Sequence, residues 1–128
     1  LVFAMSVRTH DGRVVGSPVV VGAPGQRVEV RLACSRNPAR EKMSLVLDPL
    51  APADDGTLRY AWSLSVGGRL QSEQGRVTLL PGVERSFAVR PEEPSRSVTL
   101  ALFAAPASTP GLGTYLKQRR ARLAAADT

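Results

Sequence analysis

Apolar and polar residues alternate along much of the chain, and the clearest example runs from Leu58 to Val66. In an extended conformation this stretch has one large apolar face and one small polar face, because successive side chains of a strand point to opposite sides. It holds the only Trp of the chain, Trp62, and one of its two Tyr residues, Tyr60. The alternation predicts a half-buried central strand of a β-sandwich, with Tyr60 and Trp62 in the core.

The same period of two recurs along the rest of the sequence, between segments rich in Gly and Pro. The other predicted strands are residues 1–8, 14–21, 26–34, 43–47, 69–74 with 77–80, 83–90 and 97–103. Pro18 has no N–H to give to a ladder, so its strand is placed at a sheet edge or bends at residues 16–18. Gly75 is interpreted as a β-bulge. The segment 97–103 is apolar on both faces, which predicts a strand inside a sheet.

Turn signals fit the strand pattern. The dipeptides Asp11-Gly12 and Gly67-Gly68 separate apolar runs and predict hairpins, because Gly adopts positive φ freely. A chain of 128 residues is expected to form one domain. The predicted fold is an all-β, antiparallel β-sandwich of seven to nine strands, immunoglobulin-like or similar, with a short C-terminal α-helix. Residues 1–104 form the predicted sandwich, 105–113 a linker and 114–128 a basic helix or tail, with Thr114 as the N-cap.

The strand count and the Trp strand resemble immunoglobulin-like and fibronectin-like sandwiches. Antibody domains carry two cysteines that bridge the sheets over a Trp. Cys34 is the only cysteine here, so no disulfide forms within the chain. The resemblance concerns architecture, which implies a fold and not a function.

Amino-acid composition limits which residues can form the core and bears on the origin and location of the protein. Hydrophobic residues make up 43% and aromatic residues 5%, so the core must be mostly Val, Leu and Ala. No apolar run approaches the roughly 20 residues that span a membrane, and the start at Leu1 suggests a fragment or a mature product after removal of a leader. The net charge is +6, and residues 111–128 hold half of it. The bias towards Arg and Ala favours a bacterial origin, and an extracytoplasmic location is favoured.

Few residues suggest catalytic or metal chemistry. His10 is the only histidine and lies beside a predicted turn, where an exposed role is expected. Cys34 is in phase with a predicted strand and is interpreted as a buried small hydrophobe, with a nucleophile role left as the alternative. Residues 54–56 are interpreted as a solvated turn, and Glu92 and Glu93 as loop residues. We therefore predict no enzyme activity, no catalytic or metal-binding residues and no cofactor.

The C-terminal segment is the predicted partner-binding region. On a helix, Leu112, Leu116 and Leu123 approach one stripe with Tyr115 beside it, and basic residues surround the rest. The predicted contact residues are Tyr115, Leu116, Lys117, Arg119, Arg120, Arg122 and Leu123.

The sequence favours a non-catalytic accessory, binding or assembly module that acts through protein–protein contacts, with another protein or with copies of itself. The alternative is a basic adaptor whose helix binds nucleic acid or an anionic membrane surface. Whether the helix packs on its own domain or on a partner is left open by the sequence.

Overall fold

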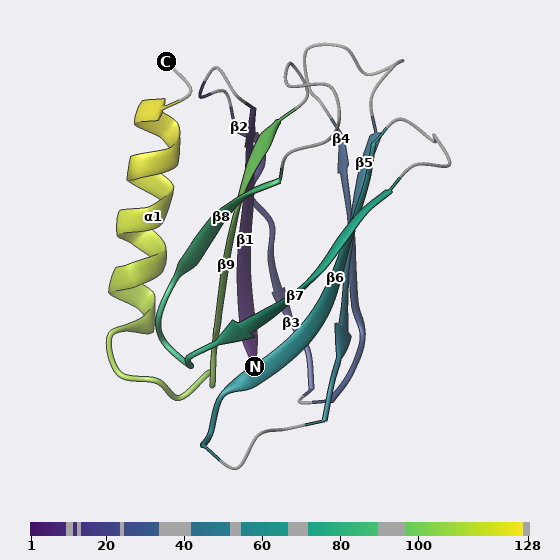
Figure 1. Cartoon of the computed structure of the whole chain (residues 1–128). Coiled ribbons are helices and arrows are strands. Elements are labelled where there is room, and N and C mark those ends of the chain that lie inside the picture. Colours follow the sequence, from purple (N-terminus) through teal and green to yellow (C-terminus); the bar gives the residue numbers. More distant parts are fainter. Residues whose placement is uncertain are drawn as a thin grey trace.

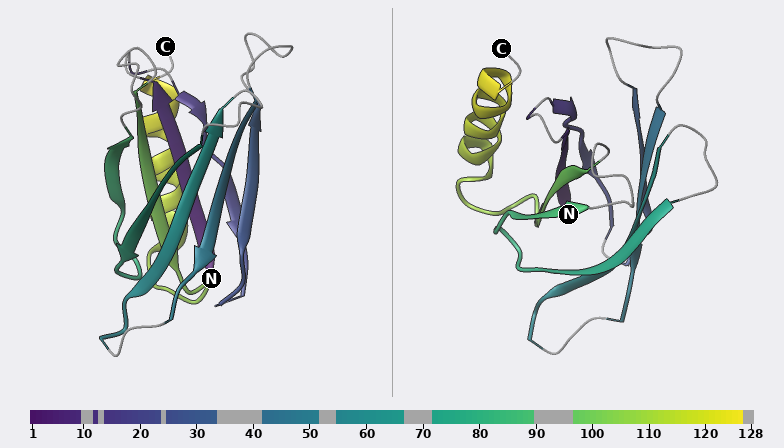
Figure 2. Two further views of the ribbon diagram at one scale, coloured as in Figure 1. Left: turned by 45° about the vertical axis from the view of Figure 1, so that its right-hand side comes forward. Right: turned by 45° about the horizontal axis from the view of Figure 1, so that its top comes forward.

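Two antiparallel β-sheets pack face to face in the computed structural model of the chain, and one helix lies on the outer face of the first sheet (Figure 1). Two further views show the same three layers (Figure 2). The structure describes residues 1–9, 12, 14–23, 25–33, 42–51, 55–66, 72–89 and 97–126. The predicted antiparallel β-sandwich with a C-terminal helix is confirmed.

The first sheet joins the two ends of the chain. Its strands are β1 (Val2–Thr9), β2 (Val14–Gly16), β3 (Val19–Val21), β8 (Arg85–Val89) and β9 (Val98–Ala105). Their order is β2-β1-β9-β8, with β3 also paired to β1, so β1 and β9 lie at the centre. The edge position and the bend predicted at Pro18 are both confirmed, because Ser17 and Pro18 separate β2 from β3 along the same edge.

The second sheet is a simple meander. It consists of β4 (Val28–Ala33), β5 (Lys42–Pro49), β6 (Leu58–Val66) and β7 (Ser72–Leu79), in that order. The chain enters it after β3 and leaves it before β8, so nearly every strand lies next to its neighbour in sequence. This connectivity differs from the Greek-key connections of immunoglobulin domains. The resemblance stated above therefore concerns the two packed sheets and not the path of the chain.

The core lies between the inner faces of the two sheets. Two aromatic pairs cross it: Phe3 meets Tyr60 edge-on with ring centroids 5.8 Å apart, and Trp62 meets Phe87 at 5.4 Å. Each pair joins one strand of the first sheet to β6, and such contacts add to the free energy gained by burial. The core positions predicted for Tyr60 and Trp62 are confirmed.

Gly75 makes room for the indole ring of Trp62. The two residues lie opposite each other in the β6–β7 ladder, whose register continues without a shift. A Cβ atom built on Gly75 would lie 2.7 Å from Cζ2 of Trp62, closer than carbon atoms can pack. The predicted bulge at Gly75 is therefore wrong. The residue is glycine because its inner face is occupied by the ring.

Helix α1 (Leu112–Ala126) covers part of the outer face of the first sheet. Beneath its first turns Ala4, Phe103 and Ala105 are buried, in contact with Leu112, Tyr115 and Leu116. The rings of Phe103 and Tyr115 stack with centroids 4.1 Å apart. The central strand β9 is thus covered on both faces over much of its length, as its sequence predicts.

The connection before the helix is shorter than the predicted linker 105–113. Strand β9 continues to Ala105, and α1 begins at Leu112. Gly111, with φ of 78°, directly precedes the helix, and its carbonyl accepts the hydrogen bond of the Tyr115 N–H at 2.9 Å. The prediction of Thr114 as N-cap is wrong, because Gly111 starts the helix and Thr114 lies within its first turn.

Candidate binding surface around the C-terminal helix

Arg119 fixes α1 to the sheet by replacing a hydrogen bond that Pro18 cannot make. Met5 and Pro18 face each other across the β1 edge, and the Met5 N–H donates to the Pro18 carbonyl at 3.0 Å. In such a pair the second residue normally returns an N–H, but proline has none. The Arg119 guanidinium donates to the Met5 carbonyl at 2.5 Å instead. The side chain that positions the helix thus also completes the edge of the sheet.

The polar groups under the helix are strongly buried. Arg119 is only 5% exposed, and burial lowers the pKa of its guanidinium. Burial, followed by the nearby Glu84 carboxylate, raises the pKa of Tyr115. The Tyr115 hydroxyl is buried and has no hydrogen-bond partner among the residues that the structure describes. The underside of α1 therefore serves packing on its own sheet.

The seven residues predicted to bind a partner fall into two groups. Arg119 and Leu123 are buried, and Tyr115 and Leu116 are half-buried against the sheet. The side chains that reach solvent are Lys117, Arg120 and Arg122. The structure answers the question left open by the sequence, since the helix packs on its own domain and offers its other side to the surroundings.

Arg122 has a partner within the domain. Its guanidinium lies 3.4 Å from the carboxylate of Glu84, the residue that precedes β8. The pair is largely exposed, and ion pairs of this kind contribute little to folding stability. Lys117 and Arg120 are the exposed helix cations whose side chains have no ion pair among the described residues.

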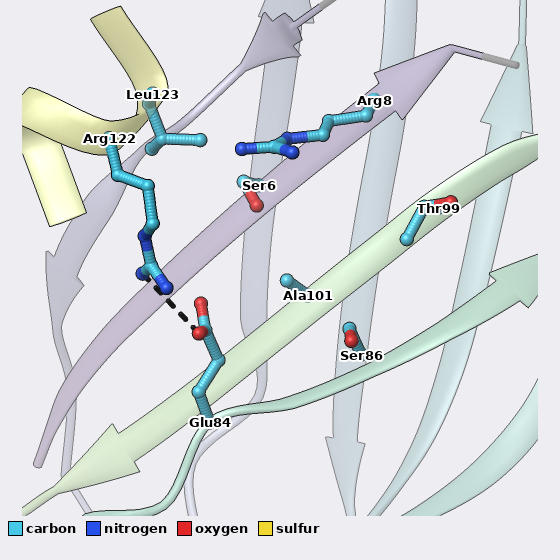
Figure 3. A pocket seen from close by; sticks show the side chains of 8 residues that line it. All are labelled: Ser6, Arg8, Glu84, Ser86, Thr99, Ala101, Arg122 and Leu123. Atoms are coloured by element: carbon cyan, nitrogen blue, oxygen red, sulfur yellow. Dashed lines mark hydrogen bonds and ion pairs between the residues drawn. The ribbon is translucent and has the colours of Figure 1, made fainter. Parts of the chain in front are cut away.

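One cleft lies between α1 and β8, and we name it the β8-side cleft (Figure 3). Its volume is about 230 Å³. Its lining residues are Ser6, Arg8, Glu84, Ser86, Thr99, Ala101, Arg122 and Leu123. The register of the sheet explains the hollow, because Ser6, Ala101 and Ser86 lie side by side across β1, β9 and β8. Three small side chains in one row leave space under the helix.

A second cleft lies on the opposite side of α1, against β2 and β3, and we name it the β2-side cleft. Its volume is about 390 Å³. Its lining residues are Val14, Ser17, Val19, Leu116, Arg119, Arg120, Leu123 and Ala124. Most of these side chains are apolar, and Arg120 places a charge at the border. Val19 is 46% exposed, and Val21, which follows it on the same face, is 79% exposed.

Sequence reasoning missed the clefts and misjudged Arg119. The residues of the β8-side cleft meet only through the β1–β9 register, which pairs the two ends of the chain. No local pattern reveals such a pairing. For Arg119 a signal was present, because it stands between Leu116 and Leu123 at the spacing of one helix face. An Arg inside an apolar stripe is a candidate for a buried, hydrogen-bonded position.

Of the residues considered for chemistry, His10, Cys34, Asp54, Glu92 and Glu93 lie outside the described part of the chain, as does the predicted hairpin turn at Gly67-Gly68.

Asp55, in the predicted turn at residues 54–56, is described. Its carboxylate accepts hydrogen bonds from the Thr57 hydroxyl at 2.6 Å and the Thr57 N–H at 3.1 Å, which lower the pKa of Asp55. Asp55 is exposed, as expected for a residue of a solvated turn.

Within the described ranges no three His, Cys, Asp or Glu residues gather where they could hold a metal ion. The one helix found there is too short and too polar to cross a membrane.

No protein-family model, curated protein or solved structure matches this chain.

Proposed function

We propose that this domain is a non-catalytic binding or assembly module that acts through protein–protein contacts. The contact surface is the β2-side cleft together with the exposed basic side of α1. One observation carries the proposal: a cleft lined by both apolar and cationic side chains lies beside two exposed valines, Val19 and Val21.

This combination has the composition of a protein interface. The buried centre of an interface is apolar, while its border is polar and rich in Arg. Val19 and Val21 offer apolar area that gains free energy when a partner removes it from water. Such exposed side chains next to a cleft favour a docking surface over an ordinary solvated face.

The charge of the helix indicates what kind of partner fits. Residues 112–126 contain no Asp or Glu, and Lys117 and Arg120 reach solvent from this segment. Complementary charge speeds association and suppresses wrong partners. The partner surface is therefore expected to combine apolar side chains with acidic ones.

The alternative function, an adaptor that binds nucleic acid or a membrane surface, is the less favoured of the two. Proteins that bind phosphate backbones use many exposed cations. Here Arg119 is buried and Arg122 pairs with Glu84, which leaves few cations on the helix for phosphates. The fully exposed side chains of the described part of α1 also include no aromatic residue for base stacking.

Site-specific photocrosslinking tests the protein-contact role. A photoreactive amino acid replaces Val21 or Arg120 in the full-length protein, within the cells that make it. The matched control places it at Arg76, an exposed residue of β7 in the second sheet. We expect discrete covalent adducts from positions 21 and 120, and their loss when Val19→Asp is added. An adduct of twice the chain mass identifies a second copy as the partner.

Two crosslinking results would contradict the proposal. Absence of adducts, or the same adducts from position 76, means that this surface makes no specific protein contact. Binding to heparin or duplex DNA across a salt series, with and without residues 112–128, tests the adaptor reading. A steep salt dependence that disappears on truncation would favour that reading instead.

A further inference from the structure

The β8-side cleft gathers two guanidinium groups and a hydroxyl around one small hollow (Figure 3). Arg8 reaches over it from β1, and Arg122 points into it from α1. The Ser6 hydroxyl lies between them, above the methyl group of Ala101. The charged groups therefore face the same space from two separate elements.

The polar groups of this hollow have unused binding capacity. Ser6 is only 4% exposed, and its hydroxyl makes no hydrogen bond to any residue that the structure describes. The hydroxyl opens onto the cleft, where it can donate a hydrogen bond to a bound acceptor. Arg8 likewise has no ion pair within the described segments. Thr99 and Ser86 supply further hydroxyls at the border of the cleft.

The position of Glu84 indicates that the cleft accepts a carboxylate. Its carboxylate already lies against the Arg122 guanidinium at 3.4 Å, in a partly exposed pair of a kind that contributes little free energy. Two guanidinium groups against one carboxylate leave one positive charge uncompensated. A second carboxylate neutralises it.

We propose that the β8-side cleft binds a small carboxylate, held by the Arg8 guanidinium and the Ser6 hydroxyl and shared with Arg122. A planar carboxylate matches the hydrogen-bonding fork of a guanidinium, which makes such contacts strong and directional. The volume of about 230 Å³ lies below the roughly 300–1,000 Å³ of pockets for drug-sized ligands, which favours a small ligand. Glu84 acts as an internal competitor for Arg122. The proposal does not depend on the protein-contact role of the β2-side cleft.

An NMR titration of the whole chain with N-acetylglycine at low ionic strength tests the site. We expect saturable shifts at the amides of Ser6, Arg8 and Ala101. Arg8→Met should weaken binding at least tenfold, while Glu84→Gln should strengthen it several-fold by freeing Arg122. Ser6→Val fills the hollow without a change of charge and should also abolish binding.

The control variant is Arg31→Met, which removes the same charge from an exposed position of β4 in the second sheet. It should leave the affinity unchanged, and all variants should retain the dispersed spectrum of the folded chain. The proposal is overturned if no shift saturates, or if Arg31→Met weakens binding as much as Arg8→Met. It is also overturned if inorganic phosphate binds as tightly as the carboxylate, because the site then has no preference for that class.

Discussion

At the scale of single residues, the inner face of the second sheet depends on glycine at position 75, because the ring of Trp62 fills the space beside its backbone. The indole of Trp62 occupies the space where a Cβ of Gly75 would lie, 2.7 Å from Cζ2. We expect Gly75→Ala to destabilise the domain by about 1–3 kcal/mol, because an overpacked core has to shift. Urea denaturation measures the change.

Gly113 supplies the matched control for that substitution. It lies within α1, its φ is not positive, and a Cβ there would meet nothing within 4 Å. Gly113→Ala should therefore raise the free energy of unfolding by about 0.5–1 kcal/mol. If both substitutions changed the free energy of unfolding in the same direction, the steric explanation for Gly75 would be wrong.

The effects of substituting Pro18 and Arg119 are also expected to depend on each other, because both residues determine which donor reaches the Met5 carbonyl. Removing the guanidinium with Arg119→Met leaves the buried Met5 carbonyl without its donor, which should cost about 1–3 kcal/mol. In a Pro18→Ala background the backbone regains an N–H that can donate to the same carbonyl. The cost of Arg119→Met should then fall by about 1 kcal/mol or more in a double-mutant cycle. Strictly additive effects would show that the two residues do not share the Met5 carbonyl.

At the scale of elements, the strands were predictable and the helix contact was not. The alternation at Leu58–Val66 defines β6 at its observed bounds, and Pro18 marks the observed break between β2 and β3. These patterns are local, since side chains of a strand alternate whatever lies opposite. The docking of α1 depends on Phe103 and Ala4, which no neighbouring sequence connects to the helix. The two clefts arise from that docking, so they too could not be predicted.

The helix is expected to be a required layer of the domain. Truncation after Thr109 removes α1 and uncovers Phe103, Ala4 and Ala105. Exposing a buried aromatic side chain costs about 1.5–3 kcal/mol, and loss of the Arg119 bond to Met5 adds to it. We expect a clear drop in the denaturation midpoint and new binding of an apolar dye.

Truncation after Ala126, which retains the whole helix, is the control and should change neither measurement. Full retention of stability after truncation at Thr109 would contradict the structural role of α1. The helix would then be free to leave the sheet and bind a partner with its apolar side.

At the scale of the whole molecule, the fold is closed by pairing of the first strand with the last. Strands β1 and β9 come from opposite ends of the sequence and pair over eight residues, from Val2 with Ala105 to Thr9 with Val98. Every other ladder between the described strands joins strands that are close in sequence. The centre of the first sheet therefore forms only when both ends of the chain are in place. Such long-range pairing is associated with slow folding.

Hydrogen exchange should reveal this closure. The core lies on one side of β1 and β9 and α1 covers part of the other, whereas β5 and β6 have one face in solvent. We therefore expect amides in the β1–β9 ladder to exchange most slowly, those of β5 and β6 next, and those of the edge strands β2, β3 and β8 fastest. Within β1, the Ser6 N–H faces β9 and the Met5 N–H faces the Pro18 edge, so Ser6 should be better protected than Met5. If β1 and β9 exchanged together with the edge strands, the terminal strands would open as a separate unit. The β8-side cleft, whose floor spans β1 and β9, would then open with them, and carboxylate binding would slow their exchange.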